Sequence, residues 1–175
     1  SGPSGVAKGA LIKQLGRTKR SLFIAAPSTT RKIRRDEIEG KDYYYISKEQ
    51  FVENIEADKF VEWCVVHNNK YGTYCSELDR IIDAGKSVLI EIDTQGAKKI
   101  KGKIADTVSI FIAPKNIKEL EQRLRGRNTE KEEDINLRLE IAKKELKDIK
   151  YYDYVIVNDD FEEAIADFEK IIAKY

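Results

Sequence analysis

The chain has 175 residues, and its 32 lysines and arginines against 31 aspartates and glutamates leave a formal net charge of +1. This length suits one domain with a sizeable core, and the balanced charge argues against a protein that binds long nucleic acid. Two cysteines, one histidine and no methionine are too few for a disulfide framework, and they predict no protein-held metal site. No apolar run approaches the ~20 residues of a membrane span and no signal-peptide pattern opens the chain, so we expect a cytoplasmic protein without a membrane partner.

Strand-like and helix-like patterns alternate along the chain. Short apolar runs predict strands at residues 22–25, 60–66, 87–92, 108–112 and 154–157. Helical periodicity predicts helices at residues 9–14, 48–56, 75–84, 116–125 and 130–150, and an amphipathic helix over 161–172. Gly85 would end the third of these helices. The alternation indicates an α/β fold with a mainly parallel sheet that helices cover on both faces.

One polar segment interrupts this alternation. Residues 29–41 read TTRKIRRDEIEGK and show no apolar period. A solvated loop is the plainer interpretation of such a charged run. The spacing of Arg31 and Arg34 allows a second one, because two arginines three residues apart can converge on one phosphate.

The chain opens on a glycine-rich turn, SGPSGVAKGA, which leads into the first predicted helix. Such a turn can hold phosphates with its backbone N–H groups, the helix N-terminus and a lysine side chain. Compared with the pattern G-x-x-x-x-G-K-[ST], Gly2 and Lys8 fit, Ala7 replaces the second glycine, and Gly9 stands in place of the hydroxyl residue. Taken alone, this turn is equally compatible with an ordinary loop.

Five later motifs follow in a fixed order. They are EGKDYYY at 39–45, FVEW at 60–63, KYGT at 70–73, EIDTQG at 91–96 and RLRGRNT at 123–129. Together with the glycine-rich turn and the arginine segment, they make the chain resemble the guanylate kinase family over essentially its whole length.

This resemblance implies a P-loop NTPase-type fold, with three α/β/α layers around a parallel central sheet. It further implies a core of residues 1–27, 74–118 and 139–175, a GMP-binding subdomain of residues 28–73 and a lid of residues 119–138. The activity that it implies is ATP-dependent phosphorylation of GMP, and of dGMP, to the diphosphate, with Mg²⁺ bound to the ATP. ATP and GMP would be the partners, and the protein would be a monomer or a homodimer.

The resemblance also assigns an acceptor site. Arg31, Arg34, Tyr43 and Tyr71 match the positions that grip the GMP phosphate. Glu62 matches the carboxylate that accepts hydrogen bonds from guanine N1–H and the exocyclic amino group. Thr73 matches a hydroxyl residue of the guanine site. Asp93 matches the second acid of the motif that starts at Glu91, and the resemblance places it in the GMP site. Without their neighbours, Glu62 would be interpreted as a surface carboxylate and the tyrosines as core residues.

On the donor side, the resemblance assigns the catalytic cations to Lys8, Arg127 and Arg138. The residues that it places against ATP are Gly2, Pro3, Ser4, Gly5, Val6, Ala7, Lys8, Gly9 and Ala10. Asn158 matches a residue that contacts the adenine. Arg138 has a structural alternative, an exposed ion-paired helix, because Asp134 lies one turn before it.

The chain departs from the family pattern at four residues: Ala7, Ala10, Pro27 and Asn128. Ala7 would strain the loop if its backbone is left-handed, Ala10 offers no hydroxyl to a metal, and Pro27 replaces a serine expected at guanine. The resemblance also implies a strand ahead of Ser1. A catalytically impaired domain that binds phosphopeptides or nucleotides is therefore the alternative function. An adenylate-type kinase is disfavoured, because the Glu62 position suits guanine donors.

Overall fold

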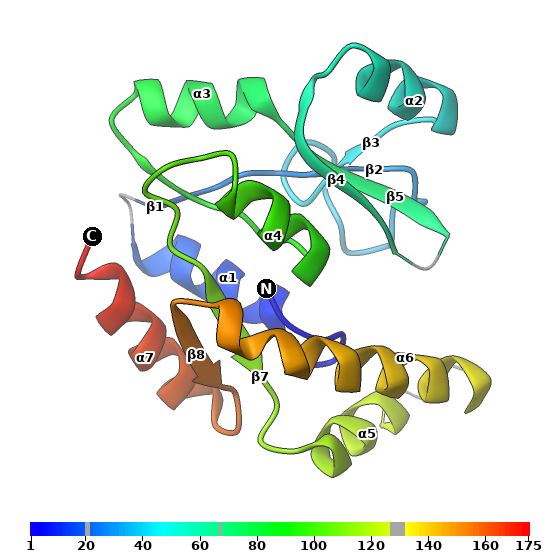
Figure 1. The fold of residues 1–175 in the computed structure, drawn as a ribbon, viewed down its shortest axis with the longest axis vertical. Coiled ribbons are helices and arrows are strands. Elements are labelled where there is room, and N and C mark those ends of the chain that lie inside the picture. The colour runs from blue at the N-terminus through cyan, green and yellow to red at the C-terminus, as the bar shows by residue number, and fades with distance from the viewer. Residues whose placement is uncertain (20–21, 67, 127–131) are drawn as a thin grey trace. The chain divides into compact units, whose positions relative to one another are not determined.

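The computed structural model describes residues 1–19, 22–66, 68–126 and 132–175. These residues form two compact units, one of residues 1–18 with 104–175 and the other of residues 19–103 (Figure 1). Each unit combines helices with parallel strand pairs, so the predicted α/β class is confirmed.

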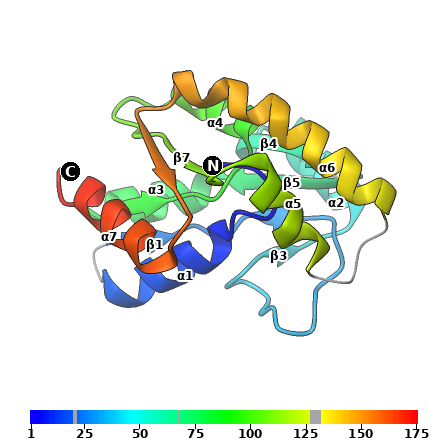
Figure 2. The same ribbon diagram turned by 90° about the horizontal axis from the view of Figure 1, so that it is seen from below.

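The first unit is built on a parallel strand pair. Strands β7 (Ile110–Ala113) and β8 (Tyr154–Val157) run side by side (Figure 2). Their register places Ile110 opposite Tyr154. Its helical segments are α1 (Lys8–Thr18), α5 (Ile117–Arg125), α6 (Glu132–Glu145), the 3₁₀ segment η1 (Leu146–Tyr151) and α7 (Phe161–Ile172). Side chains of Asn116 and Asp160 cap α5 and α7, which satisfies backbone donors at the start of each helix.

The N-terminal residue continues the ladder of this strand pair. The Ser1 amino group donates to the carbonyl of Ile110 at 2.9 Å, and the Ile112 N–H donates to the carbonyl of Ser1 at 2.7 Å. This is the bonding pattern of a parallel ladder, and it places the glycine-rich turn directly beside β7. The core beneath it contains the fully buried Phe111 and Leu11.

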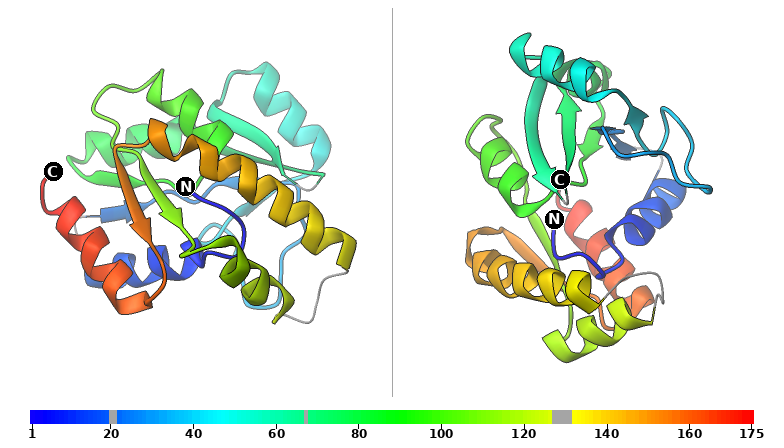
Figure 3. Two further views of the ribbon diagram at one scale, coloured as in Figure 1. Left: turned by 60° about the horizontal axis from the view of Figure 1, so that its bottom comes forward. Right: turned by 90° about the vertical axis from the view of Figure 1, so that its right-hand side faces the viewer.

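The second unit contains two sheets. Strands β1 (Leu22–Ile24) and β6 (Ser87–Leu89) pair in parallel. A four-stranded sheet has the order β3-β2-β5-β4, from β2 (Ser28–Thr29), β3 (Tyr44–Tyr45), β4 (Phe60–Val66) and β5 (Asn69–Tyr74). The antiparallel pair β4–β5 is visible in Figure 3, and its register places Glu62 opposite Thr73. The helices of this unit are α2 (Lys48–Glu56), α3 (Cys75–Asp83) and α4 (Thr94–Lys101).

Local sequence explains where the helices of the second unit begin and end. Ser47 and Gln50 form a reciprocal capping box at the start of α2. Gly85 follows α3 with a φ of 66° and donates its N–H to Ile82, so the prediction that this glycine ends the helix is confirmed. Beneath α2, the rings of Phe51 and Phe60 stack at 4.6 Å.

Several elements differ from the prediction. The strands predicted at 87–92 and 108–112 are shorter or shifted, at 87–89 and 110–113. The helix predicted over 130–150 changes to 3₁₀ geometry at residue 146, and its first two residues lie outside the described part of the chain. Strands β2, β3 and β5 and helix α4 were missed. In the described residues, no helix combines the length and apolar character needed to cross a membrane.

Candidate active site

The glycine-rich turn lies tightly against β7. Gly2 has a φ of 144°, and a Cβ built there would lie 2.2 Å from the carbonyl oxygen of Ile112. No other residue type fits this position without moving the strand. The turn therefore takes its path from a contact that only glycine permits.

Ala7 has a left-handed backbone, with a φ of 59°. Its carbonyl accepts the N–H groups of Ala10 at 3.1 Å and Leu11 at 3.2 Å, so it starts α1. The strain expected from the replacement of glycine at this position is therefore present. The first N–H groups of an α-helix have no acceptors inside the helix, and such groups are ready donors to an anion.

The Lys8 side chain folds back over the turn. Its Nζ donates to the carbonyl of Gly2 at 2.6 Å and to that of Pro3 at 2.9 Å. The ammonium group is thus held at the turn, where a phosphate bound by the loop would meet it.

Two residues far away in the sequence form hydrogen bonds to the same turn. Asn158, which is 3% exposed, donates its side-chain amide to the carbonyl of Val6 at 2.8 Å. Arg138 of α6 donates from Nη1 to the hydroxyl of Ser4 at 2.6 Å. The structure therefore brings Arg138 and Asn158 to the turn that carries Lys8. Arg127 and Asn128 lie outside the described residues.

On the second unit, Arg31 forms a two-pronged ion pair with Glu37. Its Nη2 and Nη1 lie 2.7 and 3.0 Å from the two carboxylate oxygens. Glu37 also accepts the hydroxyl of Tyr45 at 2.7 Å and the N–H of Arg34 at 2.8 Å. Burial opposes ionisation, but the hydrogen bonds from Arg31 and Tyr45 lower the pKa of Glu37 to about 2. Sequence reasoning missed Glu37, and its only signal was an acid three residues after Arg34 in a basic run.

The two predicted phosphate-binding tyrosines lie together beside this arginine. The ring centroids of Tyr43 and Tyr71 are 6.0 Å apart, and the guanidinium carbon of Arg31 lies 5.2 Å from the Tyr43 ring. Burial and the nearby Glu91 charge raise the pKa of Tyr43 to about 12, so its hydroxyl remains a donor at neutral pH. Arg34 is exposed, and its backbone N–H is the group that bonds to Glu37.

Glu62 is buried on β4, with 3% exposure, which rules out the interpretation as a surface carboxylate. The hydroxyl of Thr73, on the paired strand β5, donates to Glu62 Oε1 at 2.8 Å. The pKa of Glu62 is raised above its usual value, mainly by burial. The Asp93 charge raises it further, whereas the Thr73 hydroxyl and the Lys99 charge lower it. A carboxylate with one oxygen already bonded can still accept two adjacent N–H donors.

Asp93, at the start of α4, lies near Glu62. Its Oδ1 accepts the Gly96 N–H at 2.7 Å, so Asp93 is the N-cap of that helix. Cys64, two residues after Glu62, has a pKa raised by burial, by the Asp93 and Glu62 charges and by its hydrogen bond to Asp93. Its thiol therefore stays protonated beside the two acids. Nothing in the sequence pattern pointed to Cys64.

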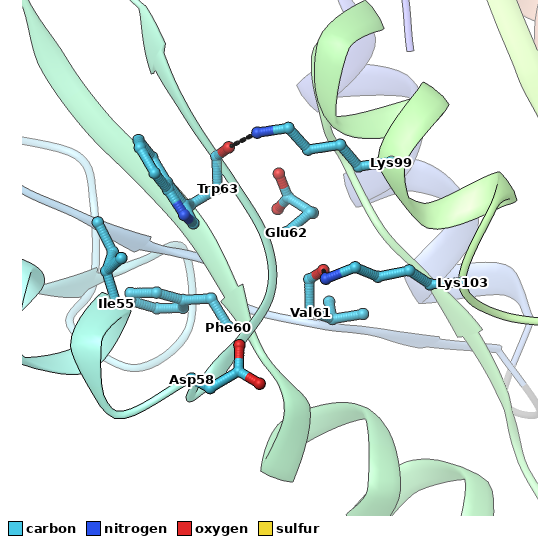
Figure 4. A pocket seen from close by; sticks show the side chains of 8 residues that line it. All are labelled: Ile55, Asp58, Phe60, Val61, Glu62, Trp63, Lys99 and Lys103. Carbon is cyan, nitrogen blue, oxygen red and sulfur yellow. Dashed lines mark hydrogen bonds between the residues drawn. The ribbon is translucent and has the colours of Figure 1, made fainter.

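A cavity of about 300 Å³ lies along β4, and Glu62 is among its lining residues. Lys99 and Lys103 reach β4 there and donate to the carbonyls of Trp63 at 2.7 Å and Val61 at 3.1 Å (Figure 4). The two lysines cover the outer edge of β4, which has no further strand beside it in the described residues.

A tight glycine-rich turn ahead of a helix, beside parallel strands, defines this chain as a P-loop α/β protein. A family model described as guanylate kinase matches residues 1–175. The guanylate kinase of Prochlorococcus marinus (strain NATL2A) is 41% identical over 97% of this chain and 91% of its own length. That of Rickettsia felis is 42% identical over 98% of this chain and 90% of its own.

Comparison with solved structures indicates the same family. The crystal structure of guanylate kinase from Anaplasma phagocytophilum superposes with a TM-score of 0.80 at 32% identity, and covers 94% of this chain and 79% of its own. The chain belongs to the guanylate kinase family.

Proposed function

We propose that this chain transfers the terminal phosphoryl group of MgATP to GMP, and to dGMP, with release of ADP. A phosphate oxygen of the acceptor forms the new bond to phosphorus as the bond to the ADP oxygen breaks. Family membership supports the reaction class. The observation that supports guanine as the nucleobase of the acceptor is the buried Glu62 carboxylate beside Thr73. Guanine presents two adjacent donors, N1–H and the 2-amino group, whereas adenine lacks that pair.

On the donor side, we assign Lys8, Arg127 and Arg138 to the charge of the transferring phosphoryl group. In such reactions, the protein mainly positions the phosphates and neutralises charge on their oxygens. The contact of Lys8 with the turn supports its role, and so does that of Arg138 with Ser4. Mg²⁺ would enter with ATP, because neither Gly9 nor Ala10 carries a side-chain oxygen at the start of α1.

ATP-site residues fall into two groups in this proposal. The backbone of residues 2–10 binds phosphate oxygens, and Asn158 contacts the adenine. The amide of Asn158 also supports the turn through the Val6 carbonyl, so this residue would serve both parts of ATP.

For the acceptor, we assign the GMP phosphate to Arg31, Arg34, Tyr43 and Tyr71, and the base to Glu62, Thr73 and Asp93. Glu37 holds the guanidinium of Arg31 with both carboxylate oxygens, and this restricts the orientations in which Arg31 would meet a phosphate. The exposed side chain of Arg34 would add its contact only when GMP is present.

We further propose that residues 28–73 and 119–138 close over bound nucleotides, with residues 1–27, 74–118 and 139–175 as the core. Closure would exclude water, which otherwise accepts the phosphoryl group and wastes ATP. Because ATP and GMP are intracellular metabolites, we place the enzyme in the cytoplasm.

The test is ADP release with GMP, dGMP, AMP, CMP or UMP as acceptor, with the parent chain, Glu62→Gln and the matched control Glu53→Gln on the exposed surface of α2. We expect GMP and dGMP to be the only efficient acceptors. Glu62→Gln should reduce kcat/KM for GMP by about 1–3 kcal/mol of transition-state stabilisation and leave the ATP KM unchanged. GMP binding without ADP release would instead identify a binding module, and a preference for AMP would refute the role of Glu62.

A further inference from the structure

The first turn of α4 rests directly against the Glu62 carboxylate. Gly96 is buried in this turn. A Cβ built on Gly96 would lie 2.7 Å from Glu62 Oε2, 3.3 Å from its Cδ and 3.3 Å from Asp93 Oδ1. Real Cβ atoms essentially never approach another atom to 2.7 Å, so a side chain at position 96 would have to displace Glu62 or α4.

Glu62 has little freedom to move away. Its Oε1 is bonded to the Thr73 hydroxyl at 2.8 Å, so rotation of the carboxylate would break that bond. Thr73 is fully buried and lies opposite Glu62 in the β4–β5 register, which fixes the hydroxyl in turn. Asp93 is tied to the same turn by its bond to the Gly96 N–H. The Glu62 carboxylate is therefore held by β5 on one oxygen and limited by α4 on the other.

We propose that Gly96 is a positioning residue for guanine specificity, because its missing Cβ sets how closely α4 approaches Glu62 and hence where the Glu62 oxygens lie. In Figure 4 the Glu62 carboxylate lies on the side of β4 from which Lys99 of α4 and Lys103, just after the helix, reach the strand. The inference rests on the proposed reading of guanine by Glu62, and it adds a residue that would act through Glu62.

The proposed contact of guanine with both Glu62 oxygens allows the position of the carboxylate to be tested by ligand affinity. GMP offers N1–H and the 2-amino group to the two oxygens of Glu62, whereas IMP offers N1–H alone. A displaced carboxylate keeps one contact more easily than two, so the preference for GMP over IMP reports on its position. A side chain with a merely structural role would change stability and leave that preference intact.

The experiment compares Gly96→Ala with Gly102→Ala. Gly102 is the C-cap of α4, and a Cβ there meets nothing closer than the carbonyl oxygen of Lys99 at 3.7 Å, so it is a matched control in the same helix. Affinities for GMP and IMP are measured by calorimetry, alongside the KM for ATP. Gly96→Ala should reduce the GMP/IMP affinity ratio at least about fivefold, since a hydrogen bond to a charged group contributes a factor of roughly ten or more. The ratio should be unchanged in Gly102→Ala, and the ATP KM in both.

A second variant separates displacement of Glu62 from a general disturbance of α4. Glu62→Asp shortens the acid by one methylene and makes room for a Cβ at position 96. In the Glu62→Asp background, Gly96→Ala should cause no further loss of the ratio and a smaller drop in Tm than it causes alone. An undiminished ratio in Gly96→Ala would overturn the inference, and so would an equal loss in both backgrounds.

Failure of the proposed function is recognised separately. Calorimetry needs no turnover, so a parent chain that binds GMP without phosphorylating it would refute the kinase activity and leave the inference standing. A parent that binds no GMP would overturn both.

Discussion

Replacement of Ala7 by glycine should make the protein more stable, although Ala→Gly changes usually destabilise proteins. Ala7 has a φ of 59°, its side chain is exposed, and its carbonyl starts α1. Its methyl group therefore contributes no core packing and imposes a strained backbone.

The magnitude follows from two opposing effects. A left-handed backbone costs an L-residue about 1–2 kcal/mol, which glycine would relieve. The greater freedom of glycine in the unfolded chain removes about 0.4–1 kcal/mol of that gain. We expect a net stabilisation of about 0.5–1 kcal/mol, or a Tm increase of about 1–4 °C for a chain of this size.

The assay is thermal and urea unfolding of the parent, Ala7→Gly and Ala10→Gly. Ala10 makes a matched control, because it is also exposed but lies inside α1, where glycine costs about 1 kcal/mol. The two variants should therefore shift the urea midpoint in opposite directions at an unchanged m-value. A decrease in both would show that the backbone at position 7 is not strained.

The same variant tests the proposed ATP site. Ala7→Gly, alone or with Ala10→Thr, should raise kcat by about two- to fivefold, because in the proposed site the altered atoms face the donor phosphates. The KM for GMP should change less than kcat. An unchanged kcat in an already active parent would show that the enzyme tolerates alanine here.

Three further predictions concern the groups around the two proposed nucleotide sites. Glu37, with its pKa lowered to about 2, should contribute at most about 3 kcal/mol of stability above pH 4.5. The free energies of unfolding of Glu37→Gln and the parent should therefore converge as the pH falls from 4.5 to 2. Asn158→Ala leaves the Val6 carbonyl unsatisfied, and should cost about 1–3 kcal/mol in unfolding and raise the KM for ATP but not for GMP. Lys99→Met removes a charge that lowers the pKa of Glu62, so more of the Glu62 carboxyl should be protonated at low pH. GMP binding should therefore weaken more at about pH 6 than at about pH 8.5. An equal loss in the control Lys103→Met would contradict a specific role of Lys99.

The sequence alone was sufficient for the family and for the elements with strong local patterns. The capping residues Ser47 and Gln50, and Gly85 at the end of α3, act within one helical turn, so their spacing in the chain contains the whole signal. The glycine-rich turn was recognisable for the same reason. By contrast, β2 and β3 have two residues each, which is too short for any periodicity to indicate a strand.

Tertiary structure decided what holds the assigned site residues in place. The bond from Asn158 to Val6 joins residues 152 positions apart, and the contact of Gly96 with Glu62 depends on the packing of a helix against a strand. The pairing of Arg31 with Glu37 is short in sequence, yet it depends on the fold of a polar segment without any period. Motifs identify residues that must touch a ligand, because their chemistry is fixed. The neighbours that orient them are set by distances through space, which the spacing of residues along the chain does not contain.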